Sequence, residues 1–331
     1  MKRPTSRAAI RGSALLVALV ALTGGSTATE RASAERAASD RAADIGSDER
    51  AIQVARRSLD AIEAGWALSA YDRASSVRAA VNVRGTQPAM GLTANVVADR
   101  VGRRVRLDAA GDVGPLTLVA DRGQALLYVP ATRQFARRAS GALAPGEWLA
   151  ADLTAELAAV RARLDAGYPL LVYLGRQEIA GRPADVVEDT PEPGTTATYW
   201  IDATTSLPRR VVLSRPGRGD VRLDLSYDRG PRPTGAELLL QGNRSVRISL
   251  TPRYDESGRL SRLQAVAGSV NGGTLTADIT FDWAPKAGRA FFRFQPPRGT
   301  AEVPFQQLAS GVLLASAGKL GALLQLFAGL A

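Results

Sequence analysis

The sequence lacks two residue types that carry much of protein chemistry. None of its 331 residues is Cys or His. Without Cys there are no disulfide bonds, so ordinary burial must hold the fold together, and the length permits this. Without His, Ser-His-Asp and Cys-His catalysis are excluded and the commonest neutral metal ligand is missing. Only carboxylates are left for a metal such as calcium. Their spacing singles out no site, so we expect neither a metal nor a cofactor.

Aromatic residues are scarce as well, at 5% of the chain. So few aromatic rings equip a protein poorly for stacking sugars, and no nucleophile with a neighbouring base is apparent. Hydrolysis by two carboxylates survives the loss of His, because 32 Asp and Glu residues are present, but no pair stands out. We therefore expect a protein that is not an enzyme and has no catalytic residues.

An export signal peptide is predicted over residues 1–28. An unbroken apolar run from Ala14 to Leu22 follows a basic start and precedes small residues. This run is too short to span a bilayer as a helix. Cleavage after Ala28 or Ala34 fits the small residues, and the distance from Leu22 favours Ala28. Because there is no lipobox Cys, we expect an exported product in the periplasm or extracytoplasmic space, without an N-terminal lipid.

The chain is basic, with a net charge of +10 and a pI near 10.5. Removing residues 1–28 takes away four basic residues and no acidic residue, which leaves +6. The remaining basic residues are mostly Arg and are scattered instead of gathered in one run. A solvated basic surface explains this pattern, with membrane-surface contact through anionic lipid headgroups as the alternative. Nucleic acid is not expected as a partner, and a monomer is expected.

Two amphipathic helices and two segments of unusual composition are predicted. Residues 29–47 are rich in Ala, Ser and alternating charge and are expected to form a disordered leader. Residues 306–331 are expected to form an apolar C-terminal helix or tail, which either lies buried against the sheet or anchors at a membrane interface. The first amphipathic helix presents Ile52, Ala55, Leu59, Ile62 and Trp66 at helical spacing. The second, inserted between Pro145 and Gly167, presents Leu149, Leu153, Leu157, Val160 and Leu164.

Most of the remaining sequence alternates apolar and polar residues with a period of two. This pattern runs from Ser75 to Ala139 and again from Ala184 to Phe281, with turn residues between short runs. Strands joined by short links pair antiparallel. We count about fifteen strands, which predict a mainly β (α+β) fold built on one large, curved antiparallel sheet over residues 48–305.

The segment Ala197–Leu213 predicts one β-hairpin of this sheet. Tyr199 and Ile201 alternate with Trp200 and Asp202, and a polar Ala-Thr-Thr-Ser turn precedes a second apolar run. Asp202 is expected to begin the turn, with Tyr199 and Ile201 facing inward.

Four segments resemble the LolA-like superfamily of periplasmic lipoprotein and lipid carriers, and particularly its DUF2092-type predicted periplasmic proteins. They are a strand, turn and Tyr-x-Pro element at 120–130, an Ile-Ala-Gly element at 179–186, the Trp-Ile-Asp and Leu-Pro hairpin at 197–213, and a closing strand with a double-proline exit at 281–305. The resemblance covers the chain from about Ala51 to Phe305. The stretch from Leu213 to Leu275 is longer than in compact carriers, and the C-terminal tail lies outside the pattern.

The resemblance implies a half-open antiparallel barrel whose mouth is covered by the N-terminal helix and the inserted helix. It further implies a hydrophobic cavity that carries or binds lipids or lipoprotein acyl chains. The alternative is a non-transporting envelope sensor or scaffold that binds a protein partner.

In such a carrier the binding site would be the set of inward alternate positions, although each side chain could equally fill a core. Period-two alternation leaves the facing of each strand ambiguous by one residue. The predicted lipid-binding residues are Val81, Val83, Val96, Val105, Leu107, Leu118, Tyr128, Tyr199, Ile201, Val211, Leu213, Phe292 and Phe294.

Overall fold

The computed structural model describes residues 48–308, with breaks. The breaks fall at 67–70, 72–73, 87–88, 100–101, 103, 113, 122–123, 140–157, 159, 163, 167–170, 193, 216–218, 229, 242–244, 269–272 and 284–286. The predicted signal peptide, the leader and all but the first residues of the predicted C-terminal helix therefore lie outside the described residues.

The described strands form one open, mainly antiparallel sheet. Their order is β16-β6-β5-β4-β3-β2-β1-β15-β14-β13-β12-β11-β10-β9-β8-β7, so β16 and β7 are its two ends. Neighbours along this order are mostly consecutive in sequence, as short hairpin links require, and the short pair of β16 with β6 is parallel. The mainly β class and the large open sheet predicted from the alternation are confirmed.

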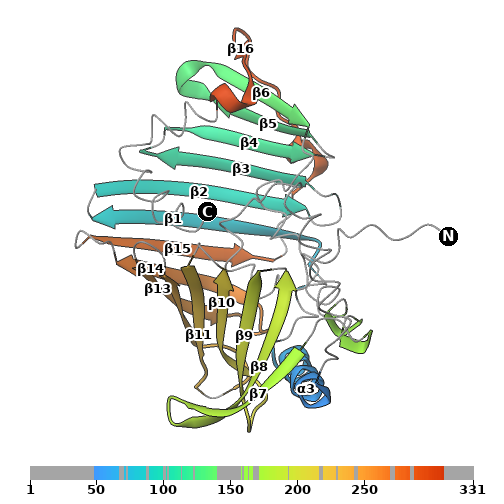
Figure 1. The fold of residues 1–331 in the computed structure, drawn as a ribbon. Helices are drawn as coiled ribbons and strands as arrows, with labels where there is room; N and C mark the ends of the chain where they lie inside the picture. Colours follow the sequence, from blue (N-terminus) through green and yellow to red (C-terminus); the bar gives the residue numbers. More distant parts are fainter. Residues whose placement is uncertain are drawn as a thin grey trace, which may run out of the picture. The chain divides into compact units, whose positions relative to one another are not determined.

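The chain divides into two compact units. Of the described residues, the first unit comprises those from 48 to 66 and from 158 to 250, and Figure 1 shows its strands in yellow-green to brown beside the blue helix. Its elements are α3 (Glu49–Gly65), β7 (Leu171–Ile179), β8 (Arg182–Glu192), β9 (Thr195–Asp202), β10 (Pro208–Arg215), β11 (Gly219–Ser226), β12 (Gly235–Gln241) and most of β13 (Ser245–Tyr254).

The second unit comprises the described residues from 71 to 139 and from 251 to 308. Its strands are β1 (Ser76–Thr86), β2 (Ala89–Asp99), β3 (Arg104–Gly111), β4 (Leu116–Asp121), β5 (Gln124–Val129), β6 (Gln134–Ala139), β14 (Leu260–Gly268), β15 (Thr274–Asp282) and β16 (Ala301–Glu302). Two short 3-10 helices, η3 (Pro130–Thr132) and η4 (Arg289–Phe292), complete it.

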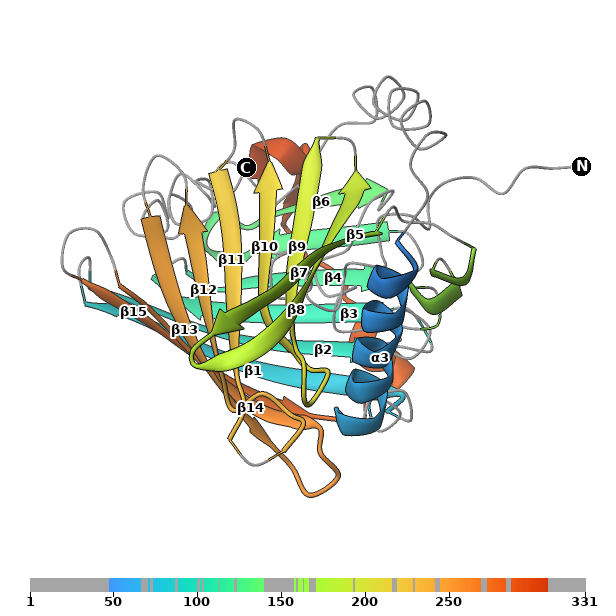
Figure 2. The same ribbon diagram turned by 60° about the horizontal axis from the view of Figure 1, so that its bottom comes forward.

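Helix α3 begins where the predicted first amphipathic helix was expected. Asp48 caps it by accepting a hydrogen bond of 2.8 Å from the backbone N–H of Arg50, and Glu49 places an acidic residue in its first turn. Its buried residues, which include Ala51, Val54 and Ile62, recur every three or four residues and so form one buried face. Figure 2 shows the helix beside β7 and β8, which it contacts. The first helix prediction is confirmed.

The predicted inserted helix is described only in part. Residues 158, 160–162, 164 and 165 are helical. Leu164 is buried in the cluster that α3 forms with the sheet, and Arg161 pairs with Asp60 and Glu63 on α3 at 2.7 and 3.0 Å. The described part of this segment therefore packs on α3. No helix among the described residues has both the length and the hydropathy needed to cross a membrane.

Candidate functional site

Many of the apolar residues of the first unit share one face of its strands. Directly opposed residues in antiparallel strands point to the same side. Tyr199 lies opposite Val211, and Leu213 lies opposite Val221. Ile201 follows Tyr199 on the same face by alternation. The structure thus brings together the four predicted cavity residues of this unit, Tyr199, Ile201, Val211 and Leu213.

Helix α3 covers part of this face. Its Ala51 and Val54 form a buried cluster with Val187 and Ile201, and Tyr199 packs against the cluster. Tyr199 and Ile201 therefore contribute to the core between helix and sheet. A second cluster on β11 to β13 contains no residue of α3. Its members are Val221, Leu223, Leu225, Ala236, Leu238, Leu240, Val246 and Ile248.

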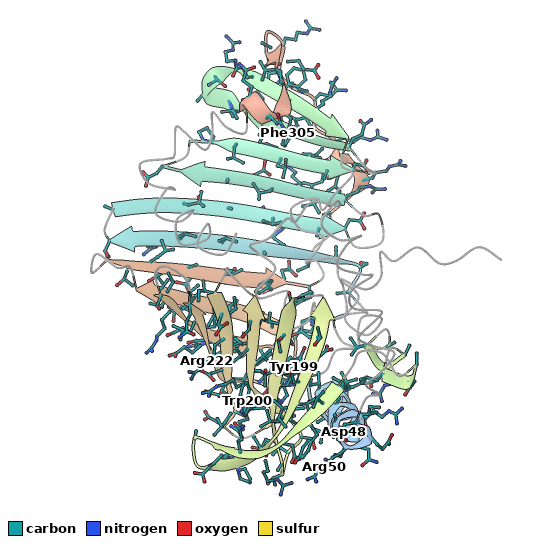
Figure 3. The ribbon with its side chains drawn as sticks, in the orientation of Figure 1. Asp48, Arg50, Tyr199, Trp200, Arg222 and Phe305 are labelled. Atoms are coloured by element: carbon teal, nitrogen blue, oxygen red, sulfur yellow. The ribbon has the colours of Figure 1, made fainter. Side chains whose placement is uncertain are left out.

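The opposite face of the same strands is more polar, although Val186, Val212 and Leu239 also lie on it. Trp200 points to this side, and its indole N–H donates a hydrogen bond of 2.9 Å to Gln177 Oε1. Asp224 accepts from Arg210 and from Arg222 and so joins neighbouring strands. Figure 3 shows Tyr199, Trp200 and Arg222 within this unit. The contrast between the two faces is the one that the alternation in the hairpin predicted.

In the second unit six predicted cavity residues share a face. Val96 lies opposite Leu107, which in turn lies opposite Leu118. Alternation along the strands places the other three on the same side. The six are Val81, Val83, Val96, Val105, Leu107 and Leu118. Val96, Val105 and Leu118 are buried, and Leu107 packs against the clusters on either side of it.

Tyr128, Phe292 and Phe294 lie on the other face of this unit. Tyr128 pairs with Thr117, one residue out of phase with Leu118, and its ring lies 5.3 Å from that of Phe294. Helix η4, which ends at Phe292, contacts β3 and β4, where Arg106 donates to its backbone. The inward-facing set predicted for this unit therefore divides into two, because a local period of two cannot fix which face each strand presents.

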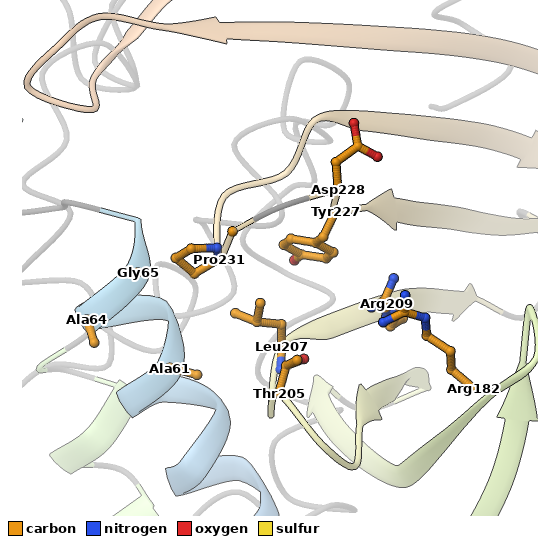
Figure 4. A pocket seen from close by; sticks show the side chains of 11 residues that line it. Ala61, Ala64, Gly65, Arg182, Thr205, Leu207, Arg209, Tyr227, Asp228 and Pro231 are labelled. Carbon is orange, nitrogen blue, oxygen red and sulfur yellow. The ribbon is translucent and has the colours of Figure 1, made fainter.

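A pocket lies at the end of the first unit where its hairpin turns gather (Figure 4). Its volume is about 460 Å³, within the range of small-molecule sites. Four parts of the chain line it: the last turn of α3, the start of β8, the β9–β10 turn with the start of β10, and the β11–β12 loop. The lining residues are Ala61, Ala64, Gly65, Arg182, Thr205, Leu207, Arg209, Tyr227, Asp228, Gly230 and Pro231.

Asp202 organises the β9–β10 turn beside this pocket. Its Oδ1 accepts hydrogen bonds of 2.9 Å from the backbone N–H groups of Thr204 and Thr205, and its Oδ2 accepts from Arg209 Nε at 2.9 Å. Burial alone would raise the pKa of this carboxyl, but these hydrogen bonds and the Arg209 charge outweigh burial and lower the pKa. The prediction that Asp202 begins the turn is confirmed.

A second buried carboxylate holds α3 to the sheet. Asp185 on β8 accepts from the Tyr173 hydroxyl at 2.8 Å and from Arg176 Nε at 3.2 Å, and Arg57 of α3 lies 3.8 Å away. Burial opposes its charge, but these partners lower its pKa. Arg50 of α3 stacks over the Tyr173 ring. These contacts bind the helix to strands β7 and β8.

The pocket was not predicted from the sequence. Its two basic residues, Arg182 and Arg209, are the first residue of β8 and the second of β10, and they lie more than twenty residues apart, so no local pattern in the sequence joins them. Among the described residues no group of three acidic side chains is placed to hold a metal ion.

No family model matches the chain, and no curated protein matches it. Solved structures similar to it include a DUF1329 family protein from Desulfovibrio piger, at 12% identity and a TM-score of 0.32, covering 72% of this chain and 96% of that chain. A LolA superfamily protein from Nitrosomonas europaea has the same identity and TM-score, covering 69% and 96%. The MucA/MucB complex of Pseudomonas aeruginosa matches at 15% identity and a TM-score of 0.19, covering 71% and 99%. At these identities the likeness is one of fold alone, and the narrower likeness to DUF2092-type proteins stays a prediction.

Proposed function

We propose that the chain is a non-enzymatic, extracytoplasmic carrier or binding protein for lipids or lipoprotein acyl chains. The observation that supports this is the continuous apolar face of the first unit. It runs from Tyr199 across β10 to β13, and the cluster on β11 to β13 includes no residue of α3.

The chemistry of this face suits an acyl chain because it offers apolar area and few polar groups. Leu213, Val221 and Leu225 on it are only half-buried. Each CH₂ group removed from water contributes about 0.8 kcal/mol, so an acyl chain with ten buried CH₂ groups would gain roughly 8 kcal/mol before the costs of association. That gain is comparable to the cost of association, so apolar burial supplies the main driving force for binding.

A matched pair of variants tests this proposal. Leu213→Gln places an amide on the apolar face, whereas Leu239→Gln makes the same change at another half-buried position on the opposite face, where Leu239 pairs with Arg222. We expect Leu213→Gln to reduce the fluorescence gain of the neutral dye N-phenylnaphthylamine severalfold, and Leu239→Gln to leave it unchanged.

Mass spectrometry of the protein purified from its native host provides the second readout. Stoichiometric bound lipid supports the proposal. A protein that carries no lipid, and whose two variants take up the dye equally, contradicts it. That result would favour the alternative of an envelope sensor or scaffold that binds a protein partner. The exposed Val172 and Leu174 on β7, the last strand of the sheet, would be available to such a partner.

A further inference from the structure

Two guanidinium groups reach the same pocket of the first unit from the starts of two different strands. Arg209 stands near the start of β10, and Arg182 begins β8. Figure 4 labels both side chains among those that line the pocket. Two positive charges that line one pocket attract an anionic ligand to it.

Arg209 is held in position by its surroundings. Asp202 receives its Nε–H, and its guanidinium lies 5.4 Å from the centre of the Tyr227 ring. The Tyr227 hydroxyl in turn donates to the backbone carbonyl of Pro208 at 2.9 Å. A guanidinium has five N–H donors, and within the described residues only Nε of Arg209 has a partner. The Nη groups are therefore fixed in place and available to a ligand.

Arg182 owes its position to a tight hairpin turn. Ala180 and Gly181 both have positive φ, at 48° and 74°, as a two-residue turn between β7 and β8 requires. The turn directs Arg182 to the end of the unit where the pocket lies. Within the described part of the chain its side chain forms no ion pair, so its full set of donors is available to a ligand.

The rest of the pocket is largely apolar. Leu207, Ala61 and Pro231 contribute hydrocarbon, and Gly65 packs so closely on Pro231 that a Cβ there would clash with the proline ring. Asp228, the only acidic residue of the lining, is exposed, and its carboxylate points away from the two Arg side chains in Figure 4. A ligand would thus meet charge on one wall and hydrocarbon on the others.

We propose that this pocket binds an organic anion, a carboxylate or phosphate monoester carried on an apolar stem. The anionic group would bridge Arg182 and Arg209, because the planar guanidinium fork matches carboxylate and phosphate oxygens. The stem would lie along Leu207 and the last turn of α3. This site does not depend on the lipid-carrier function proposed above, because it is formed by different residues at the turn end of the unit.

Calorimetric titration of the full chain with octyl phosphate tests the site, with Arg182→Gln as the variant and Arg298→Gln as the control. Both positions are exposed, so both variants should fold. Loss of charge-assisted hydrogen bonds from Arg182 should weaken binding about tenfold. Arg298→Gln makes the same change of net charge in the second unit and should bind like the original chain. Equal affinity of all three proteins, or no binding by the original chain, would overturn the proposal.

Two further ligands separate the contributions of charge and stem. Octyl glucoside carries the same stem without charge and should bind at least tenfold more weakly than octyl phosphate. Equal binding of the two would overturn the proposal. Inorganic phosphate, which has no stem, should also bind more weakly, and affinity equal to that of octyl phosphate would contradict the role of the apolar walls.

Vesicles identify the source of the anion. If phosphatidic acid in phosphatidylcholine vesicles retains the original chain and releases Arg182→Gln, the anion is a lipid headgroup. If octyl phosphate binds and the vesicles do not discriminate between the two proteins, the anion is a soluble molecule. Both results support the site, and neither depends on the dye uptake that tests the carrier function.

Discussion

Replacing Asp202 by Ala tests whether burial or distance determines how much an ion pair contributes to the free energy of unfolding of this protein. The carboxylate of Asp202 is 3% exposed and its partner Arg209 is 13% exposed, at 2.9 Å. On α3, Asp60 pairs with Arg161 at a shorter 2.7 Å, with exposures of 63% and 36%. Distance alone would rank the helix pair as the stronger, and burial ranks it as the weaker.

The expected magnitudes follow from what each substitution leaves behind. Asp202→Ala leaves Arg209 charged in a poorly solvated place, and removal of one partner of a buried pair costs about 3 to 5 kcal/mol. Thr204 and Thr205 lie in an exposed turn, so water can replace the carboxylate on their N–H groups. We therefore expect Asp202→Ala to lower the free energy of unfolding by about 3 kcal/mol, the lower end of this range. Asp60→Ala leaves Arg161 with Glu63 and with solvent, and should cost about 0 to 1 kcal/mol.

The assay is urea unfolding at pH 7, followed by circular dichroism, with the midpoint and slope compared among the original chain and the two variants. Equal slopes with a much lower midpoint for Asp202→Ala are expected. The reasoning is refuted if Asp60→Ala destabilises as much as Asp202→Ala, or if Asp202→Ala costs less than about 1 kcal/mol.

Two other predictions concern the loss of stability at low pH and the replacement of a glycine with positive φ. Asp185, Asp202 and Asp255 all have lowered pKa values, each because its hydrogen bonds and Arg neighbours outweigh burial. Their stabilisation is complete above the unfolded pKa of about 3.9 and is lost as pH falls through the folded values, so urea midpoints should drop below about pH 4. Replacing all three by Asn should flatten that drop, and an unchanged pH profile would contradict the assignment. Gly111 has φ of 128° and a Cβ there would clash with the carbonyl oxygen of Gly91. Gly111→Ala should therefore cost more than about 1 kcal/mol in thermal unfolding, whereas Gly91→Ala, with open space around it, should cost less, and the reverse order would exclude backbone strain as the cause.

The hairpin at 197–213 shows which structural features a local sequence pattern can predict. Its alternation correctly predicted two strands, the turn at Asp202 and the opposed facing of Tyr199 and Trp200. These features depend on residues close in sequence, because side chains alternate within a strand and Asp bonds its own following backbone. Helix α3 was predictable for the same reason, since its cap and apolar spacing are local.

The face of the sheet on which each strand places its apolar side chains was harder to predict from the sequence. Tyr128 follows an alternating run, yet its pairing with Thr117 places it on the face opposite Leu107 and Leu118. Shifting a strand by one residue reverses every side chain in it, and only the ladder with its neighbours settles the choice. Phe294 contacts Tyr128 although the two residues lie far apart in sequence, so no local periodicity could predict this contact.

By itself, the sequence determined the chemistry that is excluded and the class of fold. The absence of Cys and His removed whole families of catalysis, and a period of two over most of the chain required strands. Tertiary structure alone decided which apolar residues share a face and that Arg182 and Arg209 meet in one pocket. The physical reason is distance along the chain: these contacts join turns and strands that become neighbours only when the ladders form.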